Sequence, residues 1–154
     1  MMTNESLQQL ISGWIADLEF WEEGSEFLNI EVAPDQLHGL MSALKENEET
    51  KFDYLYCLTG VDWGEELGVI YHLESTEYRH RIVVRVKTAD RENPTLDTVS
   101  NIWATADFHE REVFDFFGIK FKGHPNLKRL FLTDEWEGYP LRKDYVDEIN
   151  MIIK

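Results

Sequence analysis

The sequence predicts an α+β domain with a mostly antiparallel sheet covered by helices on one face, followed by an extended irregular C-terminal arm. Three observations predict it. Helical and strand periods follow one another in the order αβαβββαα, short turns join three consecutive strands, and residues 119–154 show neither period. A chain of 154 residues suffices for one domain with its own core. We divide it into a body, residues 1–118, and a docking arm, residues 119–154.

The first part of the body is expected to alternate helices with a strand. Apolar residues at three- and four-residue spacings predict an amphipathic helix over 4–20. Alternation of apolar and polar residues predicts a strand over 28–32. Pro34 at a first helical position then begins a second helix, whose core face would comprise Leu37, Leu40, Met41 and Leu44.

Three strands are expected next, over 52–61, 68–75 and 81–87. The short links between them imply antiparallel hairpins. Pro94 would open a third helix, whose apolar face would be formed by Leu96, Val99, Ile102 and Trp103.

A last helix is expected to end the body. Glu110 stands three residues after Asp107, which is the spacing of a capping box, and Gly118 can end the helix because it is free to take a positive φ. Arg111 lies four residues from both Asp107 and Asp115, and this spacing predicts two ion pairs on the helix surface.

Composition excludes several classes of protein. One cysteine, Cys57, allows neither an internal disulfide nor a zinc or iron-sulfur site made of thiolates alone. A net charge of −15 argues against nucleic acid or an anionic membrane as the main partner. No stretch approaches the roughly 20 apolar residues that span a bilayer, and the start of the chain resembles no targeting peptide. We therefore expect a soluble, cytoplasmic chain.

The arm differs from the body in charge and in aromatic content. Residues 1–118 carry 8 Lys/Arg and 24 Asp/Glu, whereas residues 119–154 carry 7 and 6. Disorder does not fit an arm this rich in large apolar residues, so the arm should be ordered against another surface. We expect a partner protein to cover it. The residues concerned are Phe121, Leu127, Leu130, Phe131, Trp136, Tyr139, Leu141 and Tyr145.

One cluster of residues could carry chemistry. Ligands for a hard divalent metal, or an acid and base pair, could come from His109, Glu110, Glu112, Asp115 and His124. The basic residues interleaved with them favour an ion-pair network instead, because guanidinium groups neutralise carboxylates without a metal. These are Arg111, Arg129, Arg142 and Lys143. We expect no catalytic, cofactor or metal site, and a stand-alone metal-dependent enzyme remains the alternative.

Two runs of residues carry a resemblance to a known family. The first reads Glu110-Arg111-Glu112-x-x-Asp115-x-x-Gly118-Ile119-x-Phe121-x-Gly123-His124-Pro125-x-Leu127-x-Arg129 and directly follows His109. The second reads Trp136-x-Gly138-x-Pro140-Leu141-Arg142-Lys143-Asp144-Tyr145. Together they closely resemble the signature of the 30 kDa subunit of respiratory complex I, which is the C subunit of bacterial NADH:quinone oxidoreductase.

The resemblance implies a subunit without cofactor in the peripheral arm of a membrane-bound complex, on the cytoplasmic side. NADH, flavin, iron-sulfur clusters and quinone would be held by other chains. The partners would be the quinone-site subunit, expected as a separate chain because nothing follows Lys154, and the iron-sulfur subunits. Residues 109–115 would fix the junction of body and arm, 123–125 would turn the arm, and 140–145 would anchor it on partners.

Two other assignments remain open beside this one. Related domains occur in membrane-bound hydrogenases, so the electron donor stays open while the assembly role is common to both. A homo-oligomer that exchanges arms between copies is a further alternative.

Overall fold

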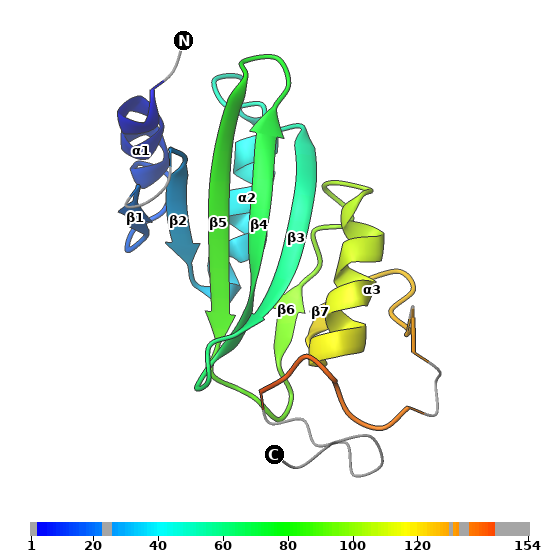
Figure 1. The fold of residues 1–154 in the computed structure, drawn as a ribbon. Helices are drawn as coiled ribbons and strands as arrows, with labels where there is room; N and C mark the ends of the chain where they lie inside the picture. The colour runs from blue at the N-terminus through cyan, green and yellow to red at the C-terminus, as the bar shows by residue number, and fades with distance from the viewer. Residues whose placement is uncertain (1–2, 23–25, 130, 133–135, 144–154) are drawn as a thin grey trace.

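The computed structural model describes residues 3–22, 26–129, 131–132 and 136–143, and the structural statements below refer to these residues. The elements lie along the chain as follows (Figure 1): α1 Asn4–Ser12, β1 Glu19–Trp21, β2 Leu28–Val32, the 3-10 turn Pro34–Gln36, α2 Leu37–Glu46, β3 Tyr54–Asp62, β4 Leu67–Ser75, β5 His80–Thr88, β6 Thr95–Asp97, α3 Ala106–Phe117 and β7 Lys120–Lys122.

Five strands form the main sheet in the order β1-β2-β5-β4-β3. The hairpins β3–β4 and β4–β5 are antiparallel, as the short turns predict, and β1 is antiparallel to β2. Only β2 and β5 run parallel in this sheet, because the chain passes through α2 and the β3–β4 hairpin between them. The prediction of an α+β fold with a mostly antiparallel sheet is therefore confirmed.

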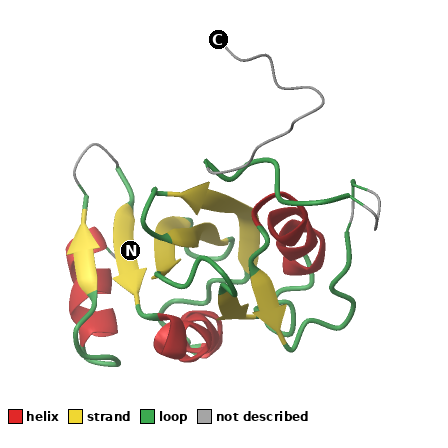
Figure 2. Cartoon of the chain, turned by 90° about the horizontal axis from the view of Figure 1, so that it is seen from below, coloured by secondary structure: helices red, strands yellow, loops and turns green. Residues whose placement is uncertain are grey.

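The helices contribute to one hydrophobic core. Seen from below, α1 and α2 lie on one side of the sheet, and α3 lies next to β3 (Figure 2). The four predicted core residues of α2 are all fully buried. Gly60 on β3 lets α3 approach closely, since a Cβ atom there would lie 2.6 Å from the Phe117 ring. No described helix crosses the opposite face of the sheet (Figure 1).

The first helix is shorter than predicted. It ends at Ser12, and residues 19–21 form the edge strand β1 instead of continuing the helix to residue 20. Pairing with β2 satisfies backbone groups that the edge of the sheet would otherwise leave open. Trp14, Ile15 and Leu18 still pack against the core, so the helical spacing indicated burial correctly but not conformation.

The predicted helix after Pro94 is also wrong. Residues 95–97 form β6, which pairs in parallel with β7 about 25 residues further along the chain, and turns follow it. Leu96, Val99, Ile102 and Trp103 are buried as expected. The Trp103 indole Nε1 donates to the Phe52 carbonyl at 2.9 Å, which fixes this irregular segment to the core.

The strand β7 places the beginning of the predicted arm within the core. Ile119 and Phe121 are both buried, and β7 is hydrogen-bonded to β6. A deletion that begins at residue 119 would therefore open the core, so an arm that can be removed without this damage begins after Lys122. The division of the chain at 118 and 119 stays a prediction.

Candidate functional site

The site lies where α3 meets the segment that follows β7. The end of α3 is as predicted: Gly118 has φ +76°, and its N–H donates to the Phe114 carbonyl at 2.9 Å. The predicted capping box at its start is wrong. The residue before the helix is Thr105, whose hydroxyl donates to the Leu55 carbonyl at 3.0 Å, and the Glu110 side chain has other partners.

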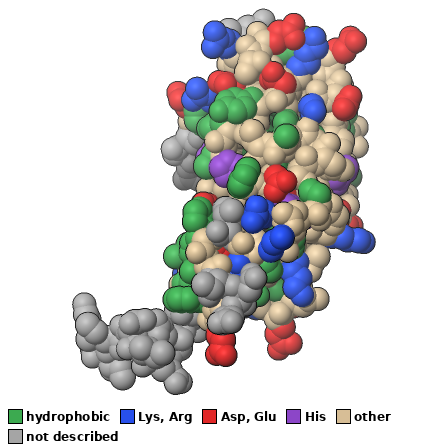
Figure 3. Space-filling model, turned by 90° about the vertical axis from the view of Figure 1, so that its right-hand side faces the viewer, with side chains coloured by type: hydrophobic (Ala, Val, Ile, Leu, Met, Phe, Trp, Pro, Cys, Tyr) green, Lys and Arg blue, Asp and Glu red, His purple; other side chains and the backbone are tan. Residues whose placement is uncertain are grey.

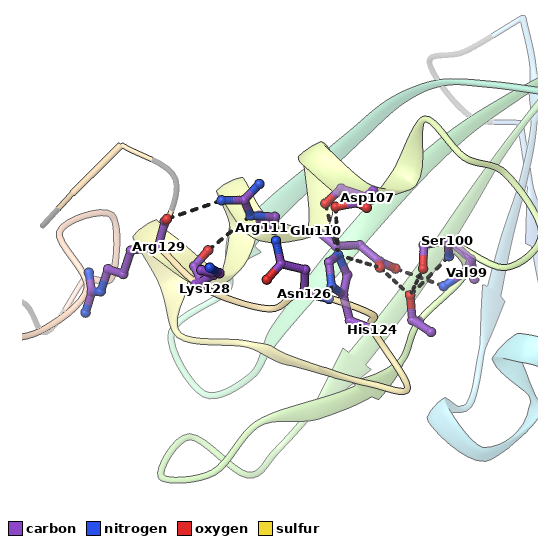
Figure 4. Close-up of polar contacts among 10 residues, drawn as sticks. Val99, Ser100, Asp107, Glu110, Arg111, His124, Asn126, Lys128 and Arg129 are labelled. Carbon is purple, nitrogen blue, oxygen red and sulfur yellow. Dashed lines mark hydrogen bonds and ion pairs between the residues drawn. The ribbon is translucent and has the colours of Figure 1, made fainter. Parts of the chain in front are cut away.

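Glu110 is fully buried and joins α3 to the loop after β6 (Figure 4). One carboxylate oxygen accepts from the backbone N–H of Val99 at 2.9 Å, and the other accepts from the Thr98 hydroxyl. Burial raises the pKa of Glu110 to about 7, and the charge of Asp107 adds to this rise. The two hydrogen bonds act in the opposite direction, so the buried carboxyl lies close to its titration point at neutral pH.

His124 links the same helix to the arm. Its ring is fully buried, and Nδ1 accepts from the Asn126 backbone N–H at 2.9 Å, so this nitrogen carries no proton. Nε2 therefore carries the proton. It lies 3.1 Å from the Asp107 carbonyl, 3.2 Å from the nearer Asp107 carboxylate oxygen and 3.9 Å from Glu110. Through these contacts His124 braces the turn that Gly123 begins with φ +86°.

Asp115 fastens the next part of the arm. Its side chain is fully buried, and one oxygen accepts from the backbone N–H groups of Phe131 at 2.7 Å and Leu132 at 3.0 Å. The Arg129 guanidinium lies 3.4 Å from the other oxygen and also donates to the carbonyls of Asp115 and Gly138, each at 3.0 Å. These two backbone N–H groups of the arm therefore donate to the Asp115 carboxylate, whereas in a sheet they would donate to carbonyl groups of a neighbouring strand.

The two predicted ion pairs of Arg111 are wrong. Arg111 donates instead to the backbone carbonyls of Lys128 at 3.3 Å and Arg129 at 3.4 Å (Figure 4). Asp107 pairs with His124, and Asp115 pairs with Arg129. Asp107, Arg111 and Asp115 are therefore directed at the arm and not at one another, which local spacing could not indicate.

The last described residues of the arm return to the body. The Tyr139 ring lies against Gly118, where a Cβ atom would be 2.5 Å from the ring, and it also contacts Phe114. The guanidinium carbons of Arg129 and Arg142 lie 4.8 Å and 5.2 Å from the centre of this ring. Arg142 donates to the carbonyls of Phe117 at 2.6 Å and Arg91 at 2.9 Å.

Sequence reasoning missed Asp62, which holds the last described part of the arm through the Lys143 backbone. Both of its oxygens accept from Arg91 at 2.8 Å, and one also accepts from the Lys143 backbone N–H at 2.8 Å. The Arg91 guanidinium is the chief cause that lowers the pKa of Asp62 well below its usual range. Asp62 directly follows the strand predicted over 52–61 and lies 81 residues before Lys143, so no local pattern marks it.

The structure brings only part of the predicted cluster together. Glu110 and His124 meet, Asp115 is engaged by the arm, Glu112 is exposed, and His109 is half-buried. Within the described ranges, no three His, Cys, Asp or Glu side chains lie close enough to hold a metal ion. Pro125 and Pro140 lie in the arm, whereas Asp144 and Tyr145 fall outside the described residues.

Four large apolar side chains of α3 and the arm are exposed, and one of them, Phe131, stacks on Phe116 of α3 with the ring centres 5.8 Å apart. We name the docking patch the four exposed large apolar residues of α3 and the arm: Phe108 (64% exposed), Phe131 (63%), Trp136 (37%) and Leu141 (56%). Hydrophobic side chains gather on this side beside Lys and Arg (Figure 3). The polar contacts thus hold the described part of the arm, and the docking patch is an exposed apolar surface.

Replacing Glu110 with Gln is expected to change how stability depends on pH. A carboxyl whose pKa is raised from 4.5 to about 7 favours the folded state below pH 4.5, and this contribution is lost as pH rises through 7. The loss amounts to about 2–4 kcal/mol at pH 8. Urea unfolding at pH 5 to 8 should therefore show a steeper decline for the wild type than for Glu110→Gln.

Glu112→Gln is the matched control because Glu112 is an exposed carboxylate on the same helix. This variant should keep the wild-type dependence on pH. Parallel curves for the wild type and Glu110→Gln would show that the buried carboxyl does not titrate in this range.

Taken together, these contacts define an α+β domain in which the described part of the arm is folded back on the body by buried charges and presents an apolar surface. Comparison with known proteins identifies the family. Residues 30–149 match the model of the 30 kDa subunit of respiratory-chain NADH dehydrogenase, and the chain belongs to this family. The resemblance drawn from the two sequence runs is therefore confirmed.

The chain is 53% identical over 122 residues to the C/D subunit of NADH-quinone oxidoreductase from Phocaeicola vulgatus. The aligned region covers 79% of this chain and 23% of the relative. It is 36% identical over 154 residues to the C subunit of the same enzyme from Chlorobium phaeobacteroides, which covers 94% of this chain and 92% of the relative. The chain thus spans less than a quarter of the C/D relatives but nearly all of the Chlorobium relative.

One solved structure shares the fold closely. It is the membrane-bound sulfane sulfur reductase, an archaeal respiratory membrane complex, with a TM-score of 0.78 and 27% sequence identity. The match covers 94% of this chain and 86% of that chain. None of the helices in the described ranges has the length and apolar character that crossing a bilayer requires.

Proposed function

We propose that this chain is a non-catalytic assembly subunit in the peripheral arm of a proton-translocating NADH:quinone oxidoreductase. Family membership and the similarity to the C subunit of Chlorobium phaeobacteroides support this role. The partners would be the quinone-site subunit and the iron-sulfur subunits. The C/D relatives are about four times as long as the matched region. Because their remaining part is joined to this region in one chain, we expect this chain to bind closely to the subunit that corresponds to that part.

The observation that carries the proposal is that polar and apolar side chains around α3 have different roles. The polar side-chain atoms of Glu110, Asp115 and His124 form hydrogen bonds with backbone and side-chain groups of this chain. A catalytic acid or base needs an atom that can reach a substrate. The docking patch, by contrast, consists of large apolar side chains that are exposed among the described residues. Such a surface suits binding to another protein.

In this proposal the chain holds no cofactor of its own. NADH, flavin, iron-sulfur clusters and quinone belong to partner subunits, and the chain lies at the cytoplasmic side of the membrane as a peripheral part of the complex. Its own contribution is to position partners and to keep their arrangement rigid. Electron transfer would then depend on this chain only through assembly.

The similarity to the archaeal sulfane sulfur reductase favours a second candidate. A domain of the same fold serves in a respiratory membrane complex whose name specifies a different reaction. The chain would then be the equivalent subunit of a related complex with another electron donor or acceptor. The assembly role is common to both candidates, so the docking patch serves either one.

The experiment is to replace Phe131 and Leu141 together with Ser in a tagged chain and to purify it from native membranes. We expect co-purification of partner subunits to fall by at least about tenfold, because central apolar contacts dominate binding energy. The fold should persist, since both side chains are exposed. Turnover per assembled complex should stay unchanged.

Gln8→Ser is the control, because Gln8 is exposed on α1 and lies outside both the docking patch and the strands of the sheet. It should leave co-purification unchanged. Full co-purification of the double variant would contradict the docking role. A loss of turnover in complexes that assemble normally would indicate chemistry in this chain.

A further inference from the structure

The face of the sheet opposite the helices carries aromatic and cationic side chains. Along β5, Arg81, Arg85 and Lys87 alternate with core residues and therefore share this face. Tyr56 and Phe27 lie close to Arg81, with their ring centres 5.5 Å and 5.9 Å from its guanidinium carbon. This open face is the surface turned toward the viewer in Figure 1.

Arg85 occupies the centre of the open face between two tryptophans. Its guanidinium carbon lies 4.8 Å from the centre of the Trp21 ring and 5.5 Å from that of Trp63. Trp21 belongs to β1 and reaches across β2, whereas Trp63 follows β3 and reaches across β4. The two indoles approach the central strand from opposite edges of the sheet.

Gly68 makes the position of Trp63 possible. A Cβ atom on Gly68 would lie 2.7 Å from the Trp63 ring and 3.0 Å from the Lys87 backbone. The missing side chain therefore allows the indole to lie across β4 toward β5, where the Lys87 ammonium is 4.9 Å from its centre. The arrangement depends on the sequence of three strands and is not a chance rotamer.

Arg85 has no carboxylate partner among the described residues, although its neighbours do. Lys87 pairs with Glu31 at 3.4 Å, and Arg81 pairs with Glu74 at 2.9 Å. Glu31 is the residue directly beside Arg85 on β2, yet it turns to Lys87. The Nε atom of Arg85 is buried without a hydrogen-bond partner.

A guanidinium held between aromatic rings keeps its N–H groups available. Stacking uses the faces of the planar group, while hydrogen bonds form at its edge. The edge can bind a carboxylate through two parallel hydrogen bonds, and holding the group in place beforehand reduces the entropy lost on binding. Arg85 is thus prepared for a carboxylate that this chain does not supply.

We propose that the open face is a second docking surface, in which Arg85, flanked by Trp21 and Trp63, receives an aspartate or glutamate of another subunit of the complex. Arg and Trp are the residues that most often dominate protein interfaces. A net charge of −15 disfavours a polyanion as the occupant, whereas a single carboxylate needs only one unpaired cation. The inference rests on the proposed function for the identity of the partner as a subunit.

This second surface is separate from the docking patch. The patch belongs to α3 and the arm, whereas the open face belongs to β1 to β5. A chain that binds through both surfaces would hold its neighbours in a fixed relative orientation. The two surfaces can be tested independently because they share no residue.

The test places a photo-crosslinking amino acid, p-benzoylphenylalanine, at Thr59 in the native membrane complex. Thr59 is exposed and pairs with Ile70, which in turn pairs with Arg85 across β4 and β5. We expect crosslinks to another subunit. They should fall by about tenfold in Arg85→Gln and also weaken in Arg85→Lys, because Lys keeps the charge but loses the planar fork.

Lys122→Gln is the control for the loss of one positive charge, because Lys122 is exposed on β7, outside the open face. It should leave the crosslinks at Thr59 unchanged. Thermal unfolding of each purified variant confirms that it is folded, and Arg85→Lys serves if Arg85→Gln is not. A crosslinker at Phe131 reports on the docking patch in parallel.

The proposal is overturned if Phe131 crosslinks to a subunit while Thr59 does not, or if crosslinks at Thr59 do not respond to either Arg85 variant. Capture of only lipid, or of only a second copy of this chain, overturns it as well. Failure at both positions would instead contradict the proposed function itself.

Discussion

Asp115→Ala is expected to detach the arm from α3 and to destabilise the chain by about 3–5 kcal/mol, because it breaks a buried ion pair. The substitution leaves two arm amides, those of Phe131 and Leu132, without their acceptor. It also removes the carboxylate that faces the Arg129 guanidinium, a side chain only 11% exposed. Urea unfolding measures the loss, and limited proteolysis between residues 123 and 143 measures the release of the arm.

Glu112→Ala provides the comparison on the same helix. Glu112 is exposed, so its removal should change stability by no more than about 0.5 kcal/mol and leave proteolysis of the arm unchanged. Equal cleavage rates for Asp115→Ala and Glu112→Ala would show that the buried carboxylate does not hold the arm.

Gly118→Ala is expected to cost roughly 1–3 kcal/mol, since the backbone there has φ +76° and an added methyl group meets a ring. The new Cβ would lie 2.5 Å from Tyr139, so this ring must move away from the end of α3. Arg129 and Arg142 both lie over the same ring and would lose this contact. Urea unfolding should show the loss, and the arm should become easier to cleave.

Gly39→Ala is the matched glycine control. Gly39 lies within α2, and nothing lies within 4 Å of an added Cβ. Because Ala is the better helix former, this variant should gain about 0.5–1 kcal/mol. If both variants changed stability in the same direction and by the same amount, the fit of Tyr139 on Gly118 would have no energetic importance.

The sequence predicts elements whose partners are near in the chain. The hairpins of β3, β4 and β5 and the core face of α2 follow from local spacing and short turns. The errors concern strands whose partners are distant or at an edge. β6 pairs with β7 about 25 residues away, and β1 exists because β2 offers an open edge. Helical spacing marked Leu96 of β6 as buried but could not indicate strand pairing.

The same limit applies to the site. Sequence alone identified Glu110, Asp115, His124 and Arg129, because charge is concentrated around a helix end and a Gly-x-Pro turn. It assigned Arg111 to acids on its own helix, whereas the structure directs it to carbonyl groups of the arm. Contacts such as Asp62 with Lys143 depend on the tertiary fold and leave no local pattern.

The central claim is that buried charges hold the arm on its own body so that the docking patch can bind another subunit. Hydroxyl-radical footprinting tests it most directly, by comparing oxidation of Phe108, Phe131, Trp136 and Leu141 in the isolated chain and in the native complex. Their exposure predicts ready oxidation in the isolated chain. We expect strong protection in the complex, with Trp14, a half-buried residue just after α1, as the internal reference. Equal oxidation of the docking patch in both samples would contradict the claim.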